Sequence, residues 1–335
     1  MRAAVTAAAG GPIGVTTVDD PAAGEGEALI EVHAVSVNRL DRAVFEGAGI
    51  GRFARFPLIQ GIDAAGVAMS GELQGRRVVV KPSAPCGECR FCDLDRDADC
   101  TSSTVMGIHR SGGFAELVVV PSHTVFEIPE ALSFEEAAAA AHVHPVTLRM
   151  IRAAGLAEGE TVLVTGAAGA VGLAAVQLST ALGARAIGVC STEAKAEAVR
   201  SQGGTAVVVG AGDLEAEIRE LTDGAGVDVV LASTGNPEVV AVAAATMGRG
   251  GRFVVVGTHV GSRLEIDLSR LYTMRQRFLG SAGSALADFG DAFELMDRAG
   301  IRPVLGAVHG LDEVAAALGE VGDRSRIGKP IIRIR

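Results

Sequence analysis

The sequence is poor in aromatic residues that carry a polar group. It contains no Trp and a single Tyr, Tyr272, among 335 residues. Because a Tyr hydroxyl is a common proton donor, its scarcity leaves acid–base chemistry to other side chains. The chain also lacks a run of about 18 consecutive apolar residues, the length that a membrane-spanning helix requires. We therefore expect no membrane partner.

Positive charge is scarce as well. The sequence has 30 Lys and Arg against 40 Asp and Glu, a formal net charge of −10. An acidic surface repels phosphate backbones, so nucleic acid is not an expected partner. The start of the chain, MRAAVTAAAGGPIG, is too short and too broken by glycine to be a signal peptide, and we interpret it as a strand and turn.

Cysteines are few and unevenly placed. Four of the five lie between Cys86 and Cys100, and Cys190 stands alone. An odd, clustered set in a chain without a predicted signal peptide does not indicate a disulfide framework. A cytoplasmic location is the default expectation.

What is abundant indicates a globular α/β protein. Hydrophobic residues make up 48% of the chain and charged residues 21%, and the length suggests roughly two domains. Short apolar or alternating runs such as ALIEVHAVSV (28–37) predict a strand-rich first part. From about residue 160, apolar strands alternate with helical patterns, which is typical of a doubly wound parallel sheet covered on both faces.

A glycine loop follows the first strand of that second part. The strand ETVLVTG (160–166) leads into Gly166-Ala-Ala-Gly169-Ala-Val-Gly172 and then into a helical pattern. The three glycines allow a tight turn, close approach of the backbone to a pyrophosphate, and close packing of helix on sheet, and the helix N-terminus offers free N–H groups. The sequence therefore predicts a dinucleotide site. Its candidate residues are Gly166, Ala168, Gly169, Ala170, Val171 and Gly172, with Ser233, Thr234 and Gly257 at the ends of later strands.

The end of the second strand bears on which dinucleotide is bound. An NAD site usually has an acidic residue there, whereas this strand ends in Cys190-Ser191-Thr192. Small hydroxyl side chains leave room for a 2′-phosphate, and Lys195 or Arg200 in the next helix could neutralise it. We therefore expect NADPH, although Glu193 lies nearby.

The cysteine cluster has the spacing of a metal site. Cys86, Cys89, Cys92 and Cys100 form the pattern C-x2-C-x2-C-x7-C. Four thiolates close a tetrahedral shell around Zn²⁺ and leave no open position for a substrate. We expect one structural zinc per chain, with an iron–sulfur cluster as the weaker alternative.

Taken together, these segments resemble the medium-chain dehydrogenases/reductases, the superfamily of alcohol dehydrogenases and quinone oxidoreductases. The resemblance rests on the cysteine lobe, SGGFAELVVVP (111–121), VTGAAGAVG (164–172), GRFVVVG (251–257) and GKPII (328–332). It implies a GroES-like catalytic domain over 1–144 and 283–335, with a zinc lobe at about 84–102, and a Rossmann NADPH-binding domain over 145–282. It also implies a homodimer.

The resemblance breaks at the catalytic zinc. The positions that hold its three ligands in zinc alcohol dehydrogenases are occupied here by Asn38, Ile62 and Val143. Neither Ile nor Val can bind a metal, so we expect no catalytic zinc. The neighbouring His142 and His144 could still recruit one.

Zinc-free relatives mostly reduce activated C=C bonds, so the resemblance implies NADPH-dependent hydride transfer to a quinone, enone, alkenal or enoyl substrate. A carbonyl, alcohol or imine oxidoreductase and a non-catalytic NADPH-binding protein remain alternatives. In the family pattern, Asn38 matches the Asn of the quinone-reductase type and Thr147 a Thr near the nicotinamide, while Lys329 matches a Lys near the cofactor.

Three further residues are candidates for the chemistry. A Tyr proton donor is missing from the stretch RAVFEGAGIGRF, which makes His144, with its neighbour His142, the replacement candidate. Both histidines could instead simply pack. Asp63 is a candidate catalytic or structural carboxylate. Solvent could also supply the proton.

Overall fold

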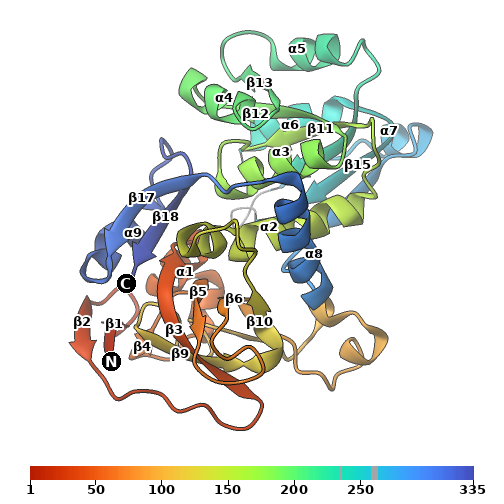
Figure 1. The fold of residues 1–335 in the computed structure, drawn as a ribbon. Helices are drawn as coiled ribbons and strands as arrows, with labels where there is room; N and C mark the ends of the chain where they lie inside the picture. Colours follow the sequence, from red (N-terminus) through yellow and green to blue (C-terminus); the bar gives the residue numbers. More distant parts are fainter. Residues whose placement is uncertain (234–235, 258–262) are drawn as a thin grey trace. The chain divides into compact units, whose positions relative to one another are not determined.

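The computed structural model describes residues 1–233, 236–257 and 263–335. The chain divides into two compact units (Figure 1). The first unit comprises Met1–Pro145, Ala285–Asp297 and Arg302–Arg335, and the second comprises Val146–Ser284 and Arg298–Ile301. The first unit is therefore assembled from both ends of the chain.

A seven-stranded sheet forms the centre of the first unit. Its longest strand, β3, alternates buried and half-buried residues along most of its length, so that Ile30, Val32 and Ala34 enter the core. Next to it lie β5 and β18, both antiparallel to β3, and β9 pairs with its first half. The strands run in the order β10 (Val125–Glu127), β6 (Arg77–Val80), β5 (Ala64–Ala68), β3 (Glu27–Ser36), β18 (Lys329–Arg333) and β17 (Leu305–Gly310), with β9 (Leu117–Pro121) on β3.

Smaller elements complete the first unit. A three-stranded sheet contains β2 (Ile13–Thr17), β1 (Arg2–Thr6) and β4 (Leu58–Ile59), and a two-stranded one contains β7 (Ser83–Ala84) and β8 (Thr104–Val105). One apolar core joins the sheets to helix α9, through side chains such as Phe114, Val118 and Leu318. The helices are α1 (Arg39–Phe45), α2 (Phe134–Ala154), α8 (Leu286–Ala299) and α9 (Val314–Glu320), of which α2 and α8 extend into the second unit.

The second unit contains a six-stranded, wholly parallel sheet. Its strand order is β13 (Thr205–Val208), β12 (Arg185–Cys190), β11 (Thr161–Thr165), β14 (Val227–Ala232), β15 (Met247–Val255) and β16 (Arg277–Gly280). This is the 3-2-1-4-5-6 order of dinucleotide-binding folds, in which the order of successive strands reverses between β11 and β14. The predicted doubly wound sheet is confirmed.

Helices follow the strands of the second unit in the expected alternation. They are α3 (Ala170–Ala181), α4 (Glu193–Arg200), α5 (Leu214–Leu221), α6 (Pro237–Ala245) and α7 (Leu268–Thr273). Helices α3 and α4 pack against β11, β12 and β13, while α6 packs against β11, β14 and β15. Because the central strands are covered by helices, consecutive residues in their middle are apolar and buried, as in Val162, Leu163 and Val164.

In the described part of the chain, no helix has the length and apolar character needed to cross a membrane.

Candidate functional site

The glycine loop has the geometry of a phosphate cradle. Gly166 adopts a φ of +65°, which favours glycine. A Cβ on Gly172 would lie 2.3 Å from the carbonyl oxygen of Gly166, so no larger residue fits there. Gly169 is the N-cap of α3 and has no side chain to occupy the N–H groups of the first turn. Those N–H groups are therefore positioned to bind an anion, as a pyrophosphate requires.

Ser191 and Thr192 follow β12 at the carboxyl edge of the sheet. Thr192 is the N-cap of α4, and its side chain accepts from the backbone N–H of Lys195. The Lys195 ammonium donates to Ser191 Oγ at 2.9 Å. These three residues lie together, and their binding of a cofactor stays a prediction.

Arg200 is engaged elsewhere. Its guanidinium lies 2.7 Å from a Glu193 oxygen and 3.1 Å from a Glu197 oxygen. Both carboxylates raise the pKa of Arg200, which is already always protonated. Lys195 is thus the better-placed cation for an anionic ligand, and Glu193 pairs with Arg200 rather than with Ser191.

The remaining cofactor candidates are partly described. The Ser233 hydroxyl donates to the carbonyl of Thr165 at 2.8 Å, which joins the ends of β14 and β11 at the point where the strand order reverses. Gly257 follows β15 with a φ of +60°. Thr234 lies outside the described residues.

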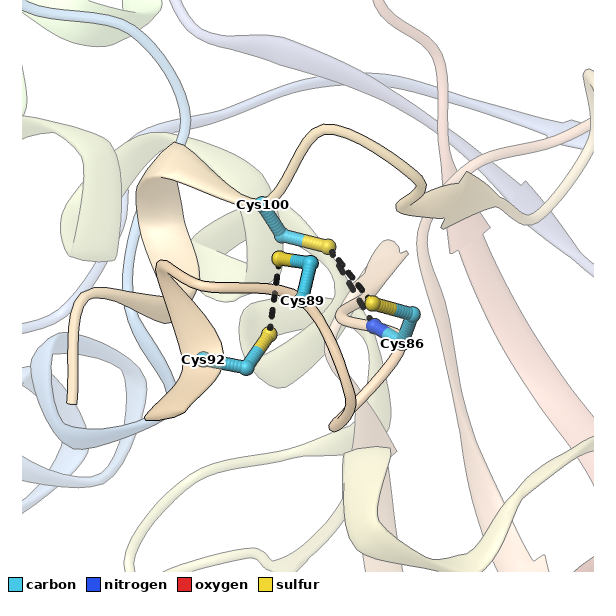
Figure 2. Close-up of side chains that lie close together, drawn as sticks. All are labelled: Cys86, Cys89, Cys92 and Cys100. Atoms are coloured by element: carbon cyan, nitrogen blue, oxygen red, sulfur yellow. Dashed lines mark hydrogen bonds between the residues drawn. The ribbon is translucent and has the colours of Figure 1, made fainter. Parts of the chain in front are cut away.

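The four clustered cysteines point toward one another (Figure 2). Their sulfur atoms all lie within 4.8 Å of one another, with Cys89 and Cys92 at 3.6 Å and Cys86 and Cys100 at 3.5 Å. A tetrahedral zinc with Zn–S bonds of about 2.3 Å separates its sulfurs by about 3.8 Å, so the cluster fits that ion. Backbone hydrogen bonds, the largest from Cys92, lower the pKa of Cys89 to about 6, which favours the thiolate.

The lobe that carries these cysteines is tied to helix α8. Two short 3₁₀ helices, Cys92–Leu94 and Asp97–Asp99, form part of it. Asp97 Oδ2 accepts from the backbone N–H of Leu286, the first residue of α8, at 2.7 Å. A carboxylate at this place satisfies one of the free N–H groups of the helix and complements its dipole.

A second polar cluster surrounds the buried carboxylate of Asp63. Its Oδ2 accepts from Ser36 Oγ at 2.5 Å, from Asn38 Nδ2 at 2.9 Å and from Lys329 Nζ at 2.7 Å. Lys329 also donates to the Ala139 carbonyl in α2. Asp63 Oδ1 is buried and has no hydrogen-bond partner among the described residues. We refer to Ser36, Asn38, Asp63 and Lys329 as the Asp63 cluster.

Asp41 supports this cluster from helix α1. It accepts from the backbone N–H groups of Asn38 and Ile62. Burial and the neighbouring charge of Asp63 raise the pKa of Asp41 to about 7. The carboxyl group therefore changes charge near neutral pH.

Two of the three residues that the resemblance assigns to the catalytic-zinc positions are wholly apolar. Ile62 is fully buried in a cluster with Val44, Leu58 and Ile108, and Val143 is 4% exposed. Asn38 already donates to Asp63. The donor set does not fit a catalytic zinc, since hydrocarbon side chains offer no ligand atom.

The helix α2 carries the histidine candidates. His144 is 2% exposed and Thr147 is fully buried, whereas His142 is half-buried. Burial is the main cause that lowers the pKa of His142. The negative charge of Asp63 raises this pKa, whereas the ammonium groups of Lys329 and Lys81 lower it further. His142 is thus under the electrostatic influence of the Asp63 cluster.

Sequence reasoning missed three polar residues of the first unit. Ser36 lies two residues before Asn38, and Asp41 closes the N-x-x-D pattern, so the stretch SVNRLD held the signal for both. Lys81 is buried, and its ammonium donates to the carbonyl and hydroxyl oxygens of Ser83. Nothing in its sequence context distinguished it from a surface lysine.

Comparison with known proteins yields a consistent set of relatives. Residues 24–130 match the alcohol dehydrogenase GroES-like domain, and residues 170–298 match the zinc-binding dehydrogenase family. The NAD-dependent alcohol dehydrogenase of Sulfolobus acidocaldarius is 28% identical, with 100% of each chain covered. The acryloyl-coenzyme A reductase of Metallosphaera sedula is 29% identical, with 95% of each covered.

A solved structure extends this similarity to the whole fold. The cobalt- and zinc-bound thermostable alcohol dehydrogenase from Pyrobaculum aerophilum has a TM-score of 0.87 and is 32% identical, with 100% of this chain and 99% of that chain covered. An α/β fold with a GroES-like domain and a Rossmann-type domain is therefore confirmed. The chain belongs to the medium-chain dehydrogenase/reductase superfamily, a family of oxidoreductases.

Proposed function

We propose that the protein is a zinc-independent, NADPH-dependent reductase of C=C bonds conjugated to a carbonyl group. The observation that carries the proposal is the replacement of the catalytic-zinc ligands by Asn38, Ile62 and Val143, two of them apolar and buried. Without a Lewis acid, a simple ketone or aldehyde is harder to polarise. An enone, alkenal, quinone or enoyl thioester already has an electrophilic β-carbon.

In this chemistry NADPH supplies a hydride to the β-carbon, and the negative charge moves to the carbonyl oxygen. The protein must offer hydrogen bonds to that oxygen and allow a proton to reach the α-carbon. Asn38, Asp63, His142, His144 and Thr147 are the candidate residues. The similarity to an acryloyl-coenzyme A reductase supports this reaction class.

The preference for NADPH rests on the end of β12. No carboxylate follows Cys190 directly, and the Lys195 ammonium already contacts the Ser191 hydroxyl. A 2′-phosphate bound here would accept from both groups. The Sulfolobus relative is named as NAD-dependent, so the two cofactors must be compared directly on this chain.

A carbonyl or alcohol oxidoreductase is the second candidate, because relatives in the family are named alcohol dehydrogenases. A protein that binds NADPH without catalysis is the third. Under all three, the cysteine lobe holds one structural zinc and the ligand is a small molecule.

A homodimer is part of the proposal. In the described part of the chain, β16 is the last strand of the six-stranded sheet, and an edge strand of this kind is able to pair with another. On the preceding helix α7, Leu268 is 72% exposed and Tyr272 is 82% exposed. Light scattering coupled to size-exclusion chromatography should give twice the chain mass; a monomer at micromolar concentration would contradict this part.

The decisive experiment is incubation of the protein with NADPH and 2-cyclohexenone, followed by identification of the product by NMR and mass spectrometry. We expect cyclohexanone. Formation of the allylic alcohol would contradict C=C reduction and favour the second candidate. NADPH binding without turnover of 2-cyclohexenone, acryloyl-coenzyme A, a quinone or an aldehyde would favour the third.

A further inference from the structure

Lys81 is a buried cation that belongs neither to the glycine loop nor to the Asp63 cluster. It directly follows β6 and is 2% exposed. Its ammonium group donates to the carbonyl and hydroxyl oxygens of Ser83, both at 2.7 Å. Neither acceptor carries a charge, so these contacts position the ammonium group without neutralising it. A buried charge costs free energy unless an opposite charge lies nearby.

The ammonium group of Lys81 lies at the neck of the cysteine lobe. Ser83 belongs to β7, which pairs with β8, and the lobe is the stretch of chain between these two strands. Lys81 also lines a small hollow with Ala84 and Thr104, which are partners in that pair of strands. The lysine is therefore placed where the chain enters and leaves the lobe.

Negative charges reach Lys81 from the lobe and from helix α8. The backbone N–H of Cys86 donates to Cys100 Sγ at 3.3 Å, which brings the last cysteine of the lobe back to its start. Burial lowers the pKa of Lys81 to about 8, whereas the charges of Asp97, Asp288 and Cys100 raise it. The ammonium group is thus within electrostatic reach of one sulfur of the cluster and of two carboxylates.

The lobe itself has an excess of negative charge. From its first cysteine to its last, the sequence has five Asp and Glu residues and two Arg residues. Four thiolates also exceed the charge of one Zn²⁺ by two. The two arginines, Arg90 and Arg96, both lie over the ring of Phe91, and Arg96 pairs with Asp99 as well. A buried ammonium group at the neck is placed to offset part of this excess.

We propose that Lys81 is a charge-compensating residue of the metal site in the cysteine lobe, where Ser83 holds its ammonium group and the positive charge stabilises the four thiolates. This proposal rests on the structural zinc included in the function proposed above. The thiolate is the form of cysteine that binds a metal, so a fixed positive charge nearby favours binding. The lysine keeps its proton and makes no bond to the metal.

The test separates the charge of Lys81 from its hydrogen bonds. Lys81→Gln keeps an N–H donor for Ser83 but removes the charge, whereas Lys81→Arg keeps the charge. Zinc affinity of each full-length variant is measured by competition with a chromophoric chelator of known zinc affinity. We expect the dissociation constant to rise about 10- to 100-fold in Lys81→Gln, as for other residues around the ligands of metal sites, and less than about 3-fold in Lys81→Arg.

Arg77→Gln is the matched control, because it removes a half-buried cation from the other end of β6. The Arg77 guanidinium donates to the carbonyl oxygen of Leu132 and lies over the ring of Phe134, so these contacts are made outside the lobe. Its zinc affinity should equal that of wild type, and thermal unfolding shows whether each variant is folded. Wild-type affinity in Lys81→Gln, or an equal loss in Arg77→Gln, would overturn the proposal.

A second measurement reports on the thiolates directly. Co²⁺ bound by thiolates in place of zinc gives a charge-transfer absorption band, in which an electron moves from sulfur to metal. A positive charge near the sulfurs makes this transfer harder, so the band should move to longer wavelength in Lys81→Gln and stay in place in Arg77→Gln. A change in overall stability does not shift the band. An unshifted band in Lys81→Gln would contradict the charge-compensating role.

The two proposals fail differently. If wild type holds one zinc per chain and Lys81→Gln binds it equally tightly, the structural zinc stands and the role of Lys81 is wrong. If wild type with reduced cysteines binds no zinc, both are wrong. If Lys81→Gln does not fold, Ser83→Ala decides in its place, because it removes one of the two acceptors that hold the ammonium group. Wild-type affinity and an unshifted band in Ser83→Ala would then overturn the role of Lys81.

Discussion

The cysteine lobe and the Asp63 cluster compensate negative charge in opposite ways. In the lobe, four sulfur atoms gather within 4.8 Å, and the hydrogen bonds between Cys86, Cys89, Cys92 and Cys100 join thiol to thiol or to backbone. In the Asp63 cluster, the chain supplies its own cation, Lys329, at 2.7 Å. On the proposed assignment, the lobe takes its cation from solution as a metal ion, whereas the Asp63 cluster has the ammonium group of Lys329 as its cation.

The largest effect should come from removing one lobe thiolate. Cys89→Ala leaves three ligands for a metal whose binding free energy in small domains is about 10–16 kcal/mol. We expect zinc to fall from one per chain to none after dialysis against a chelator, together with a lower thermal midpoint. Elemental analysis and calorimetry measure both.

Cys190→Ala is the matched control for this comparison. Cys190 is buried in β12 of the second unit, where burial raises the pKa of its thiol to about 11. The variant should keep its zinc. Retention of one zinc by Cys89→Ala, or its loss from Cys190→Ala, would disprove the assignment of the lobe.

The next largest effect concerns the internal cation. Lys329→Met leaves the Asp63 carboxylate buried without its ion-pair partner, which costs about 3–5 kcal/mol of unfolding free energy. Urea denaturation measures the loss. The double variant Lys329→Met/Asp63→Asn removes both charges and should recover part of it.

Zinc content tests whether the two regions are independent of each other. Lys329→Met should keep one zinc per chain, because the lobe does not depend on the Asp63 cluster for its ligands. A double variant as unstable as Lys329→Met would show that hydrogen bonding, rather than charge compensation, holds the Asp63 cluster together.

A smaller effect is expected at a cation that is only half-buried. Lys195→Ala removes the ammonium beside Ser191 and should raise the KM for NADPH roughly 10-fold, the effect of one charge-assisted hydrogen bond. The KM for NADH should not change, because NADH has no 2′-phosphate. Arg200→Ala is the control, since Glu193 and Glu197 already hold that guanidinium. Equal effects on both cofactors would contradict NADPH selectivity at this site.

The lobe and the glycine loop could be predicted from the sequence because their signals are local. The four cysteines lie within 15 residues, and the glycines Gly166, Gly169 and Gly172 lie at the junction of β11 and α3, so spacing alone determines which atoms meet. The proposed metal site and phosphate cradle therefore need no information about distant segments. The parallel sheet could also be predicted from the order of elements along the chain, because alternating strands and helices are compatible with few topologies.

The Asp63 cluster could be predicted only in part, because its members come from β3, the N-cap of α1, β18 and the loop before β5. Each candidate was visible by position, but the ion pair joins residues 266 apart in sequence. Burial of Lys329 depends on the pairing of β18 with β3, which no local pattern encodes. The ion pairs of Arg200 with Glu193 and Glu197 could likewise be seen only in the structure, because they depend on how helix α4 orients these side chains.

The smallest expected effect is a pH dependence of the unfolding free energy that arises from Asp41. Asp63 has Lys329, whereas Asp41 has backbone N–H groups, and its pKa is raised to about 7 by burial and by Asp63. Because the folded protein holds this proton more tightly than the unfolded chain, Asp41 stabilises the fold at low pH. This contribution declines as pH rises from the unfolded pKa of about 4 through the folded value of about 7, and the last part of the decline should lower the unfolding free energy by about 1 kcal/mol between pH 6 and pH 8.

Asp41→Asn tests this directly, since the amide does not titrate. The variant loses one backbone hydrogen bond at every pH, because an amide group can accept at only one of its two polar atoms. Its unfolding free energy should nevertheless fall less steeply between pH 6 and pH 8 than that of wild type, measured by urea titration at each pH. Histidines that titrate in the same range contribute equally to both proteins and cancel in the difference. Parallel pH profiles would mean that Asp41 stays charged, and that the two N–H groups of Asn38 and Ile62 compensate a buried carboxylate as well as Lys329 does.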